Sequence, residues 1–392
     1  MAAQDITGLI GLESELGLAE EYELAGAVAL WLLLAGHDTP YVRASLAADI
    51  AAADVGWRWL ARTDWPGAAE TARLSRRNLG LFCRVAHSFE RAPLWDGAAL
   101  AGRTILVKHA FGYGDLLLRL RHVRELVERF GARVVLEVAA PLARLVRTSP
   151  YVASVVAPIV PPAVARDDRR DLAGVALDCW VPSFDLPVFL DCRHDAPMWG
   201  PYLTVERGLI DRWRRRLGPG DGRLRVGLVW AADVSHEWGR TRSMHLSELA
   251  PLARVPGVRW FSLQKTGSIR RAWTRPVDGG PEEEPAPSGL GLTRLGPQLD
   301  DFADTAGALS ALDLLITVDT SVANLAGGLS LPNWVLLPTG APAAVWGADG
   351  ERCAAYPSAA LFRQRTPGDW APVVARVAEA LRQLVAERRS AA

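Results

Sequence analysis

The stretch Asp313-Leu314-Leu315-Ile316-Thr317-Val318-Asp319-Thr320-Ser321-Val322-Ala323-Asn324-Leu325-Ala326-Gly327-Gly328 decides the fold. Its apolar run, Leu314–Val318, has the length and β-branched content of a buried strand in a parallel sheet. Three good N-cap residues follow, and a helix of small residues continues from them. A helix N-terminus at the carboxyl edge of a sheet is suited to bind a diphosphate. An ordinary strand-to-helix crossover fits the same pattern, and on that pattern alone it is the commoner outcome.

The composition describes two or three globular domains. The chain has 392 residues, 49% of them hydrophobic, and a formal net charge of zero. Zero net charge gives no reason to expect nucleic acid or an anionic membrane as a partner. The longest apolar run, Leu24–Gly36, is too short to cross a bilayer, so we expect neither a membrane span nor a signal peptide. A reducing, cytoplasmic location is expected because no metal-ligand or redox spacing joins the four cysteines, Cys83, Cys179, Cys192 and Cys353.

Residues 1–91 are predicted to form an all-α module. Apolar residues recur at helical spacing between Leu46 and Leu60, and again between Leu79 and Phe89. Strand signals and clusters of glycine and proline are rare in this part of the chain. We therefore expect antiparallel helix pairs, loosely like tetratricopeptide units, although no clean repeat period is visible.

From Trp95 onward, strands alternate with helices, and this alternation predicts parallel α/β sheets. We expect two Rossmann-like halves, residues 92–205 and 206–365, followed by an amphipathic helix in residues 366–392. Two such halves imply a ligand site between the carboxyl ends of their sheets. The predicted strands are Thr104–Lys108, Arg133–Val138, Arg225–Trp230, Val258–Gln264, Leu314–Val318 and Asn333–Leu337.

A turn after the first predicted strand resembles the start of a dinucleotide-binding fingerprint. Gly112 and Gly114 have the spacing of its first two glycines, and Glu137 ends the next strand, where a ribose-binding acid would lie. Leu117 occupies the position of the third glycine, so the match is weak. An NAD-type oxidoreductase is therefore a lesser alternative, which binding of a reduced cofactor would test by fluorescence.

Seven stretches in the same order resemble family 9 glycosyltransferases, especially bacterial proteins with a tetratricopeptide module ahead of a heptosyltransferase-like domain. With this resemblance, nucleotide binding becomes the favoured role of the turn at Asp319. The stretches are Gly112–Asp115, Gly227–Trp230, His236 with Arg240 and Arg242–Ser243, Ser262–Lys265, Asp301–Ala306, Val318–Gly327, and Tyr356–Ser358 with Leu361–Gln364.

The resemblance implies a GT-B fold preceded by the helical module. It places the acceptor side first and the nucleotide-sugar side second, with the last helix crossing back to the first half. It also implies inverting sugar transfer from a nucleotide sugar, with no metal cofactor. Asp115 matches the position of the candidate base, and Gly112 and Gly114 belong to the acceptor side. The positions matching donor contacts are Trp230, His236, Arg240, Arg242, Gln264, Lys265, Asp319, Thr320, Ser321 and Asn324.

The residues fit that chemistry on their own terms. The sequence contains no Asp-x-Asp metal signature, so protein charge would have to stabilise a leaving diphosphate. A helix N-terminus at Thr320, together with Arg240, Arg242 and Lys265, could supply that charge. Inverting transfer also needs one base for the acceptor hydroxyl, and Asp115 is the expected base. A plain helix-capping role is the alternative for the same carboxylate.

Several positions depart from the family pattern. Asn324 stands where histidine is usual, Ala232 replaces a glycine, Gly239 an aspartate and Val345 an arginine. Asparagine can donate a hydrogen bond but cannot carry charge. These departures leave the donor open and keep a degenerate nucleotide-binding interaction protein as an alternative.

The helical module suggests what receives the sugar. Stacked helix pairs commonly present a groove for a peptide, and this module joins the acceptor half with little spacer. We therefore expect a protein acceptor modified on serine or threonine hydroxyls, such as a flagellar or surface subunit. The alternative is a saccharide acceptor, with the helices serving stability or homodimerisation.

Overall fold

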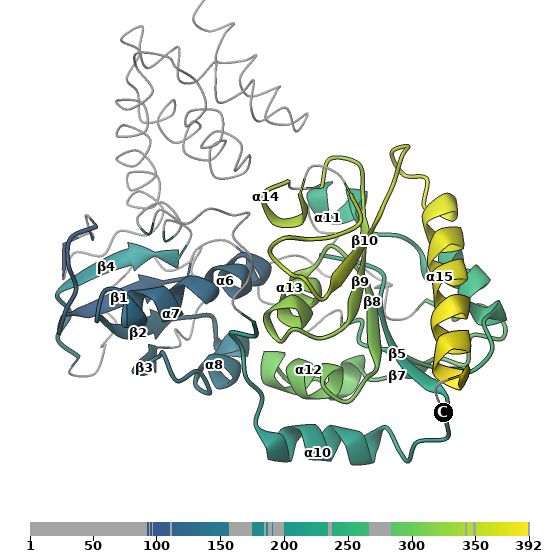
Figure 1. The fold of residues 1–392 in the computed structure, drawn as a ribbon, viewed down its shortest axis with the longest axis horizontal. Coiled ribbons are helices and arrows are strands. Elements are labelled where there is room, and N and C mark those ends of the chain that lie inside the picture. Colours follow the sequence, from purple (N-terminus) through teal and green to yellow (C-terminus); the bar gives the residue numbers. More distant parts are fainter. Residues whose placement is uncertain are drawn as a thin grey trace, which may run out of the picture.

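The computed structural model describes residues 92–390 with several gaps. The gaps are positions 94, 96 and 342 and the segments 110–111, 157–174, 184–185, 187–189, 191–199, 234–236, 266–283 and 348–349. The predicted helical module and His236 lie outside the described residues. The described chain forms two parallel sheets, which Figure 1 shows side by side with helices around them.

The first sheet has the order β3-β2-β1-β4, and its neighbouring strands are all parallel. The strand order reverses beside β1, so the turn after β1 lies where α/β folds usually bind ligands. The elements of this half are β1 (Thr104–Lys108), α6 (Tyr113–Arg119), α7 (Arg121–Glu128), β2 (Arg133–Glu137), α8 (Ala140–Val146), β3 (Ser154–Val156) and β4 (Cys179–Pro182).

The second sheet has the order β10-β9-β8-β5-β6-β7 and is also parallel. Its order reverses between β5 and β8, which places the loop after β8 at the second switch point. Its elements are α10 (Arg207–Arg216), β5 (Leu224–Val229), α11 (Glu237–Thr241), the 3₁₀ helices η2 (Leu246–Arg254) and η5 (Gly296–Gln298), β6 (Val258–Ser262), β7 (Thr293–Arg294), α12 (Phe302–Leu309), β8 (Leu314–Val318), α13 (Ser321–Gly328), β9 (Asn333–Leu337), α14 (Ala343–Trp346), β10 (Ala359–Arg363) and α15 (Ala371–Ser390).

The central strand β8 is buried along its whole length, as its unbroken apolar run predicts. Leu315 faces a core that continues through α12 and α13 to the helices of the first half. Leu314, Ile316 and Val318 face a second core beneath η2 and α15. The six predicted strands are confirmed; three have the predicted ends, and the ends of the other three differ by one or two residues.

The last helix differs from the expectation. We expected residues 366–392 to cross back to the acceptor side, but α15 packs on the second half, against η2 and β10. Val373, Val377 and Leu381 are buried in the core that lies on one face of the second sheet. In Figure 1, α15 lies on the side of the second sheet away from the first. The expected crossing is wrong for the described part of this helix because its apolar face covers the sheet that precedes it.

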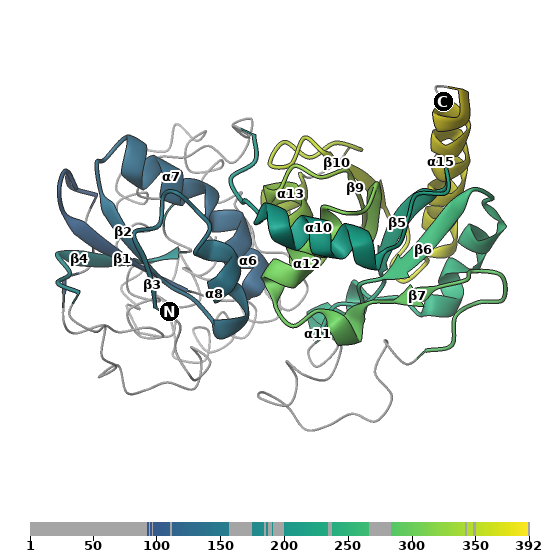
Figure 2. The same cartoon turned by 90° about the horizontal axis from the view of Figure 1, so that it is seen from below.

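The two halves meet through their helices. α6 of the first half packs on α13 of the second, and α8 packs on α12. The Tyr113 and Phe302 rings add an aromatic contact at 5.2 Å between centroids. Figure 2, a view from below, shows α6 and α8 facing α13 and α12. These contacts bring the turn before α6 next to the start of α13.

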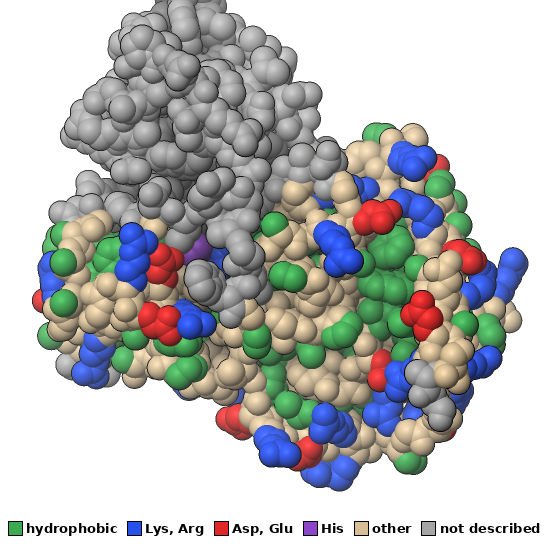
Figure 3. Space-filling view, viewed as in Figure 1, with side chains coloured by type: hydrophobic (Ala, Val, Ile, Leu, Met, Phe, Trp, Pro, Cys, Tyr) green, Lys and Arg blue, Asp and Glu red, His purple; other side chains and the backbone are tan. Residues whose placement is uncertain are grey.

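Among the described residues, no helix is both long enough and apolar enough to cross a bilayer. On the face shown in Figure 3, basic and acidic side chains are interspersed over the described part, in keeping with the zero net charge.

Candidate functional site

The Gly112–Asp115 turn, which is predicted to lie on the acceptor side, places Asp115 in the first turn of α6. We call it the acceptor-side turn. Gly112 is the N-cap, with extended backbone at φ −78° and ψ 167°, and it is exposed. The Gly112 N–H donates to Asp115 Oδ2 at 2.9 Å. The predicted capping role of Asp115 is therefore real, but it uses only one carboxylate oxygen. A carboxylate fixed in this way can still accept a proton at its other oxygen.

The electrostatic surroundings of Asp115 come from both halves. Burial raises the pKa of the Asp115 carboxyl, and the Asp319 carboxylate adds to that rise. The Gly112 hydrogen bond and the positive charges of Arg119 and Arg242 act in the opposite direction. Asp319 and Arg242 belong to the second half, so their influence shows that the two halves share one electrostatic environment. A raised pKa suits a general base.

Gly114 of the first half lies close to α13 of the second half. A Cβ atom at this position would lie 3.0 Å from Asn324 Nδ2 and 3.4 Å from Ser321 Cα. Both neighbours belong to α13, so a side chain here would displace the Asn324 amide by a few tenths of an ångström or move the starts of α6 and α13 apart. The glycine is required by this close approach rather than by a positive φ.

We expect Gly114→Ala to separate the two helix starts by a few tenths of an ångström and lower turnover about 10-fold, since transfer geometry is sensitive to small displacements. Gly208→Ala is the control, because a Cβ at Gly208 meets nothing within 4 Å. Steady-state kinetics of both variants provides the measurement. Equal turnover in the two variants would show that this approach does not matter for the reaction.

The turn at Asp319 and Thr320, which is predicted to bind the donor, lies at the switch point of the second sheet. We call it the donor-side turn. Thr320 is the N-cap of α13, and its side chain accepts a hydrogen bond from Val322 N–H at 3.2 Å. The Thr320 carbonyl accepts from Ala323 N–H at 3.0 Å. These two hydrogen bonds already satisfy part of the N-terminus of α13, which leaves fewer N–H groups for a ligand than an uncapped helix would offer. The dipole of α13 and the backbone of Ser321 are still available to bind an anion.

Arg242 supplies a cation at this same turn. Its Nη1 lies 3.5 Å from Asp319 Oδ2, and Asp319 is buried. Among the residues that the structure describes, the buried Nε of Arg242 has no hydrogen-bond partner. Buried polar groups without partners are uncommon and call for an explanation such as a bound ligand. The Arg242 side chain is 28% exposed, so part of it is also accessible to an anion at this turn.

Asn324 is held by a short chain of hydrogen bonds that sequence analysis did not foresee. Its Oδ1 accepts from the Tyr356 hydroxyl at 2.9 Å, and its Nδ2 donates to the Thr320 carbonyl at 3.3 Å. The Tyr202 hydroxyl lies 3.4 Å from that of Tyr356 and donates to the Leu117 carbonyl in α6 at 2.9 Å. Burial raises the pKa of Tyr202 to about 12, so this hydroxyl stays protonated at neutral pH.

Two residues predicted to bind the donor are core residues instead. The Trp230 side chain is buried in the core that also packs η2 and α15. Gln264 is buried as well, and its Oε1 accepts from the N–H groups of Trp230 and Ala231 at 3.1 and 3.0 Å. Its Nε2 donates to the Ala231 carbonyl at 3.0 Å. With its amide satisfied, Gln264 closes the end of β5 rather than facing a ligand.

The remaining predicted donor residues are spread out. Lys265 Nζ donates to the Leu299 carbonyl and lies 3.5 Å from the Asp300 carbonyl, so it supports a turn rather than the start of α13. Arg240 is exposed at the end of α11. His236 lies outside the described residues. Of the predicted site, the structure therefore brings together Gly112, Gly114, Asp115, Arg242, Asp319, Thr320, Ser321 and Asn324.

Comparison with known proteins finds a curated relative in sequence and solved structures of similar fold. No family model matches the chain. Protein FlbA of Caulobacter vibrioides is 29% identical over 311 residues, which are 74% of this chain and 48% of FlbA. The chain thus spans about half the length of this curated relative.

Solved structures define the class of fold. The E. coli ADP-heptose lps heptosyltransferase II is similar with a TM-score of 0.50 and 14% identity, over 73% of this chain and 99% of the heptosyltransferase. The family 9 glycosyl transferase from Veillonella parvula DSM 2008 gives a TM-score of 0.49 and 11% identity, over 74% and 99% of the two chains. The likeness to heptosyltransferase II confirms the two-sheet GT-B fold that the sequence resemblance implied.

Proposed function

We propose that the chain is a glycosyltransferase that moves a sugar from a nucleotide sugar to a hydroxyl acceptor with inversion and without a metal. The observation that carries this proposal is the contact between the Asp115 turn of one half and the Asp319 turn of the other, each at the switch point of its sheet. The GT-B fold supports the same class of chemistry.

In the proposed reaction, Asp115 takes the proton of the acceptor hydroxyl. The hydroxyl oxygen attacks the anomeric carbon from the face opposite the leaving group, which forms one glycosidic bond and breaks the bond to the diphosphate oxygen. The anomeric configuration is therefore inverted. Arg242 and the N-terminus of α13 stabilise the negative charge on the departing diphosphate. This division of roles places the base on the acceptor half and the anion site on the donor half.

A donor screen tests the proposal. Nucleotide sugars with different bases and sugars, ADP-heptose included, are offered to the full chain, and the true donor should raise the melting temperature because it binds only the folded state. ADP-heptose is chosen because the name of the E. coli neighbour contains it. No shift with any nucleotide sugar would contradict the proposal.

Arg242→Gln should weaken binding of the selected donor roughly 10- to 100-fold, because a charge-assisted hydrogen bond to phosphate is lost. Titration calorimetry measures the change. This substitution is a cleaner test than Thr320→Ala or Asp319→Ala, because Thr320 also caps α13 and Asp319 is buried beside Arg242. Arg223→Gln is the control, since Arg223 pairs with Asp221 in an exposed loop. Unchanged affinity in Arg242→Gln would remove this residue from the donor site.

The proposed acceptor is a protein hydroxyl on serine or threonine, and this part rests on the predicted helical module. A saccharide acceptor is the alternative, favoured by the name of the E. coli neighbour, which contains the words lps heptosyltransferase. Parallel transfer assays with a labelled donor, one offering serine and threonine peptides and one offering oligosaccharides, distinguish the two acceptor classes.

The oxidoreductase alternative gains no support from the structure. Glu137, which would bind a ribose, lies 4.0 Å from the Lys108 amino group. Leu117, at the third glycine position, is fully buried.

A further inference from the structure

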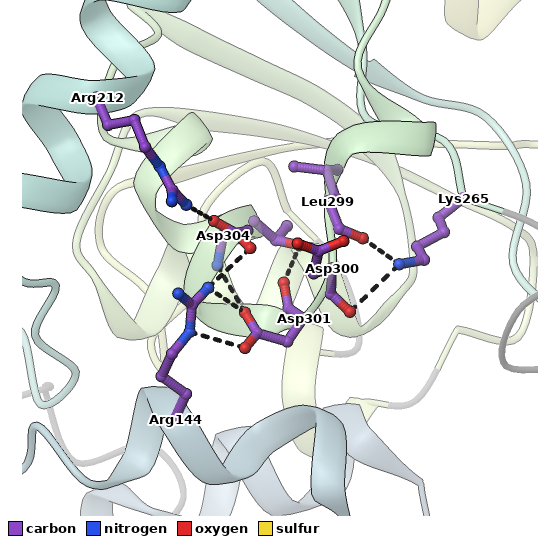
Figure 4. Close-up of polar contacts among 8 residues, drawn as sticks. Arg144, Arg212, Lys265, Leu299, Asp300, Asp301 and Asp304 are labelled. Atoms are coloured by element: carbon purple, nitrogen blue, oxygen red, sulfur yellow. Dashed lines mark hydrogen bonds and ion pairs between the residues drawn. The ribbon is translucent and has the colours of Figure 1, made fainter.

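A cluster of two arginines and two aspartates lies where the halves meet, and Figure 4 shows it in close-up. Arg144 binds Asp301 through two parallel hydrogen bonds, Nε to Oδ2 at 2.8 Å and Nη2 to Oδ1 at 2.7 Å. Arg144 Nη2 also lies 2.8 Å from Asp304 Oδ2. Arg212 donates to the other oxygen of Asp304. We call these four residues the arginine–aspartate cluster.

The cluster joins three separate parts of the fold. Arg144 lies on α8 of the first half, Arg212 on α10, the first helix of the second half, and the two aspartates at the start of α12. Asp304 is buried, with a side chain only 3% exposed, so both of its oxygens need partners. The two guanidiniums supply them from different elements. One buried carboxylate therefore joins α8 of the first half to α10 and α12 of the second half.

Hydrogen bonds within the second half hold the two aspartates of the cluster in place. Asp301 is the N-cap of α12, and its Oδ1 accepts from Asp304 N–H at 2.9 Å. Thr305 Oγ1 donates to the Asp301 carbonyl at 3.0 Å. Lys265 fixes the preceding turn through the Leu299 and Asp300 carbonyls. The aspartates are thus pre-positioned, and the orientation of the first half depends on where Arg144 docks.

Bidentate geometry makes this docking directional. Two parallel bonds between a planar guanidinium and a carboxylate constrain rotation as well as distance, which a lysine point charge does not. Tyr113, the first residue of α6, also contacts Phe302, which follows Asp301 in the chain and begins α12. Tyr113 lies between Gly112 and Gly114, so a rotation of the first half on α12 would move the acceptor-side turn.

We propose that Arg144 is a positioning residue that fixes the orientation of the two halves and thereby sets the distance between the acceptor-side turn and the start of α13. The joint itself follows from the contacts alone, while its effect on turnover rests on the proposed function. The hydrogen bonds of the cluster include none to Asp115, Asp319 or Arg242 among the described residues. Arg144 therefore acts through the arrangement of the halves.

Hydrogen exchange of the full chain without ligand tests the joint. In Arg144→Gln, amides of α8 and α12 should exchange roughly 10-fold faster, because charge-assisted bonds across the interface are lost. Arg124→Gln is the matched control, since it removes an ion pair with Glu128 at 2.8 Å that stays within one helix. Arg144→Lys should recover part of the protection. Equal exchange in Arg144→Gln and Arg124→Gln would overturn the proposal.

Kinetics provides the second readout. Arg144→Gln should lower kcat roughly 10-fold and leave the KM for the donor within about 2-fold, because the donor turn lies wholly on the second half. A rise in the donor KM with unchanged kcat would contradict a positioning role. If the unaltered chain releases no diphosphate from any nucleotide sugar, the proposed function fails, and hydrogen exchange still decides whether the joint exists.

Discussion

Asp115→Asn should lower kcat about 10²- to 10⁴-fold while leaving donor affinity nearly unchanged, because the amide keeps the shape of the carboxylate but cannot accept the proton. The donor contacts lie on the other half, so calorimetry with the selected donor should give the same affinity as the unaltered chain. Asp221→Asn, in an exposed loop beside Arg223, is the control and should leave kcat unchanged. Normal turnover in Asp115→Asn would exclude this residue as the base.

The pH dependence of the same residue follows from its raised pKa. Turnover requires the ionised carboxylate, so kcat/KM should fall as the pH drops through a pKa above the ordinary value of 3.8. For stability the sign is opposite. A raised folded-state pKa means that the folded chain holds this proton more tightly than the unfolded chain, so the carboxylate destabilises the fold as the pH rises above 3.8. Asp115→Asn should therefore be at least as stable as the unaltered chain at neutral pH.

Gly327→Ala should destabilise the fold by about 1–3 kcal/mol and lower the Tm by roughly 1–4 °C. A Cβ at this position would lie 2.3 Å from Cδ1 and 2.4 Å from Cγ of the Tyr356 ring. Both residues are fully or nearly fully buried, so the ring has little room to retreat. Any displacement of the ring would also release Asn324, whose Oδ1 accepts from the Tyr356 hydroxyl.

Differential scanning calorimetry measures this effect against Gly208→Ala as control. Gly208 is also helical, but a Cβ there meets nothing within 4 Å, and alanine is the better helix former. Its Tm should be unchanged or slightly higher. If the Gly327→Ala and Gly208→Ala chains have the same Tm, the Tyr356 ring is not packed tightly against α13.

The sequence predicts those features that depend on local patterns. Apolar runs identify the central strands, and the cap residues after Val318 identify the start of α13, where Thr320 is the N-cap. The Gly112–Asp115 turn is likewise found from its order after a strand. These are the elements that bring the two parts of the proposed site together.

Features that depend on distant partners are not predictable in this way. Arg144 and Asp301 are separated by 157 positions, and no local period connects them. A motif match also does not say which way a side chain points, so Trp230 and Gln264 match the family pattern yet lie in the core. Gly327 and Gly328 of α13 likewise make room for Tyr356 and Tyr202, which are distant from them in the sequence.

The structure also explains how asparagine fits at position 324. The amide accepts from the Tyr356 hydroxyl and donates to the Thr320 carbonyl, so both of its ends are satisfied without charge. Asn324 therefore stabilises the cap of α13 and lies against Gly114 of the other half. Its role at the interface is compatible with an active enzyme as well as with nucleotide binding alone.

The most direct test of the proposed transfer site is the anomeric configuration of the sugar product. It is observed by NMR while the full chain consumes the donor selected in the thermal-shift screen. An inverting site with Asp115 as base on one half and the diphosphate on the other predicts a first-formed product of inverted configuration, released together with an equal amount of nucleoside diphosphate. A product that retains the configuration of the donor, or a bound nucleotide sugar from which no diphosphate is released, would contradict it.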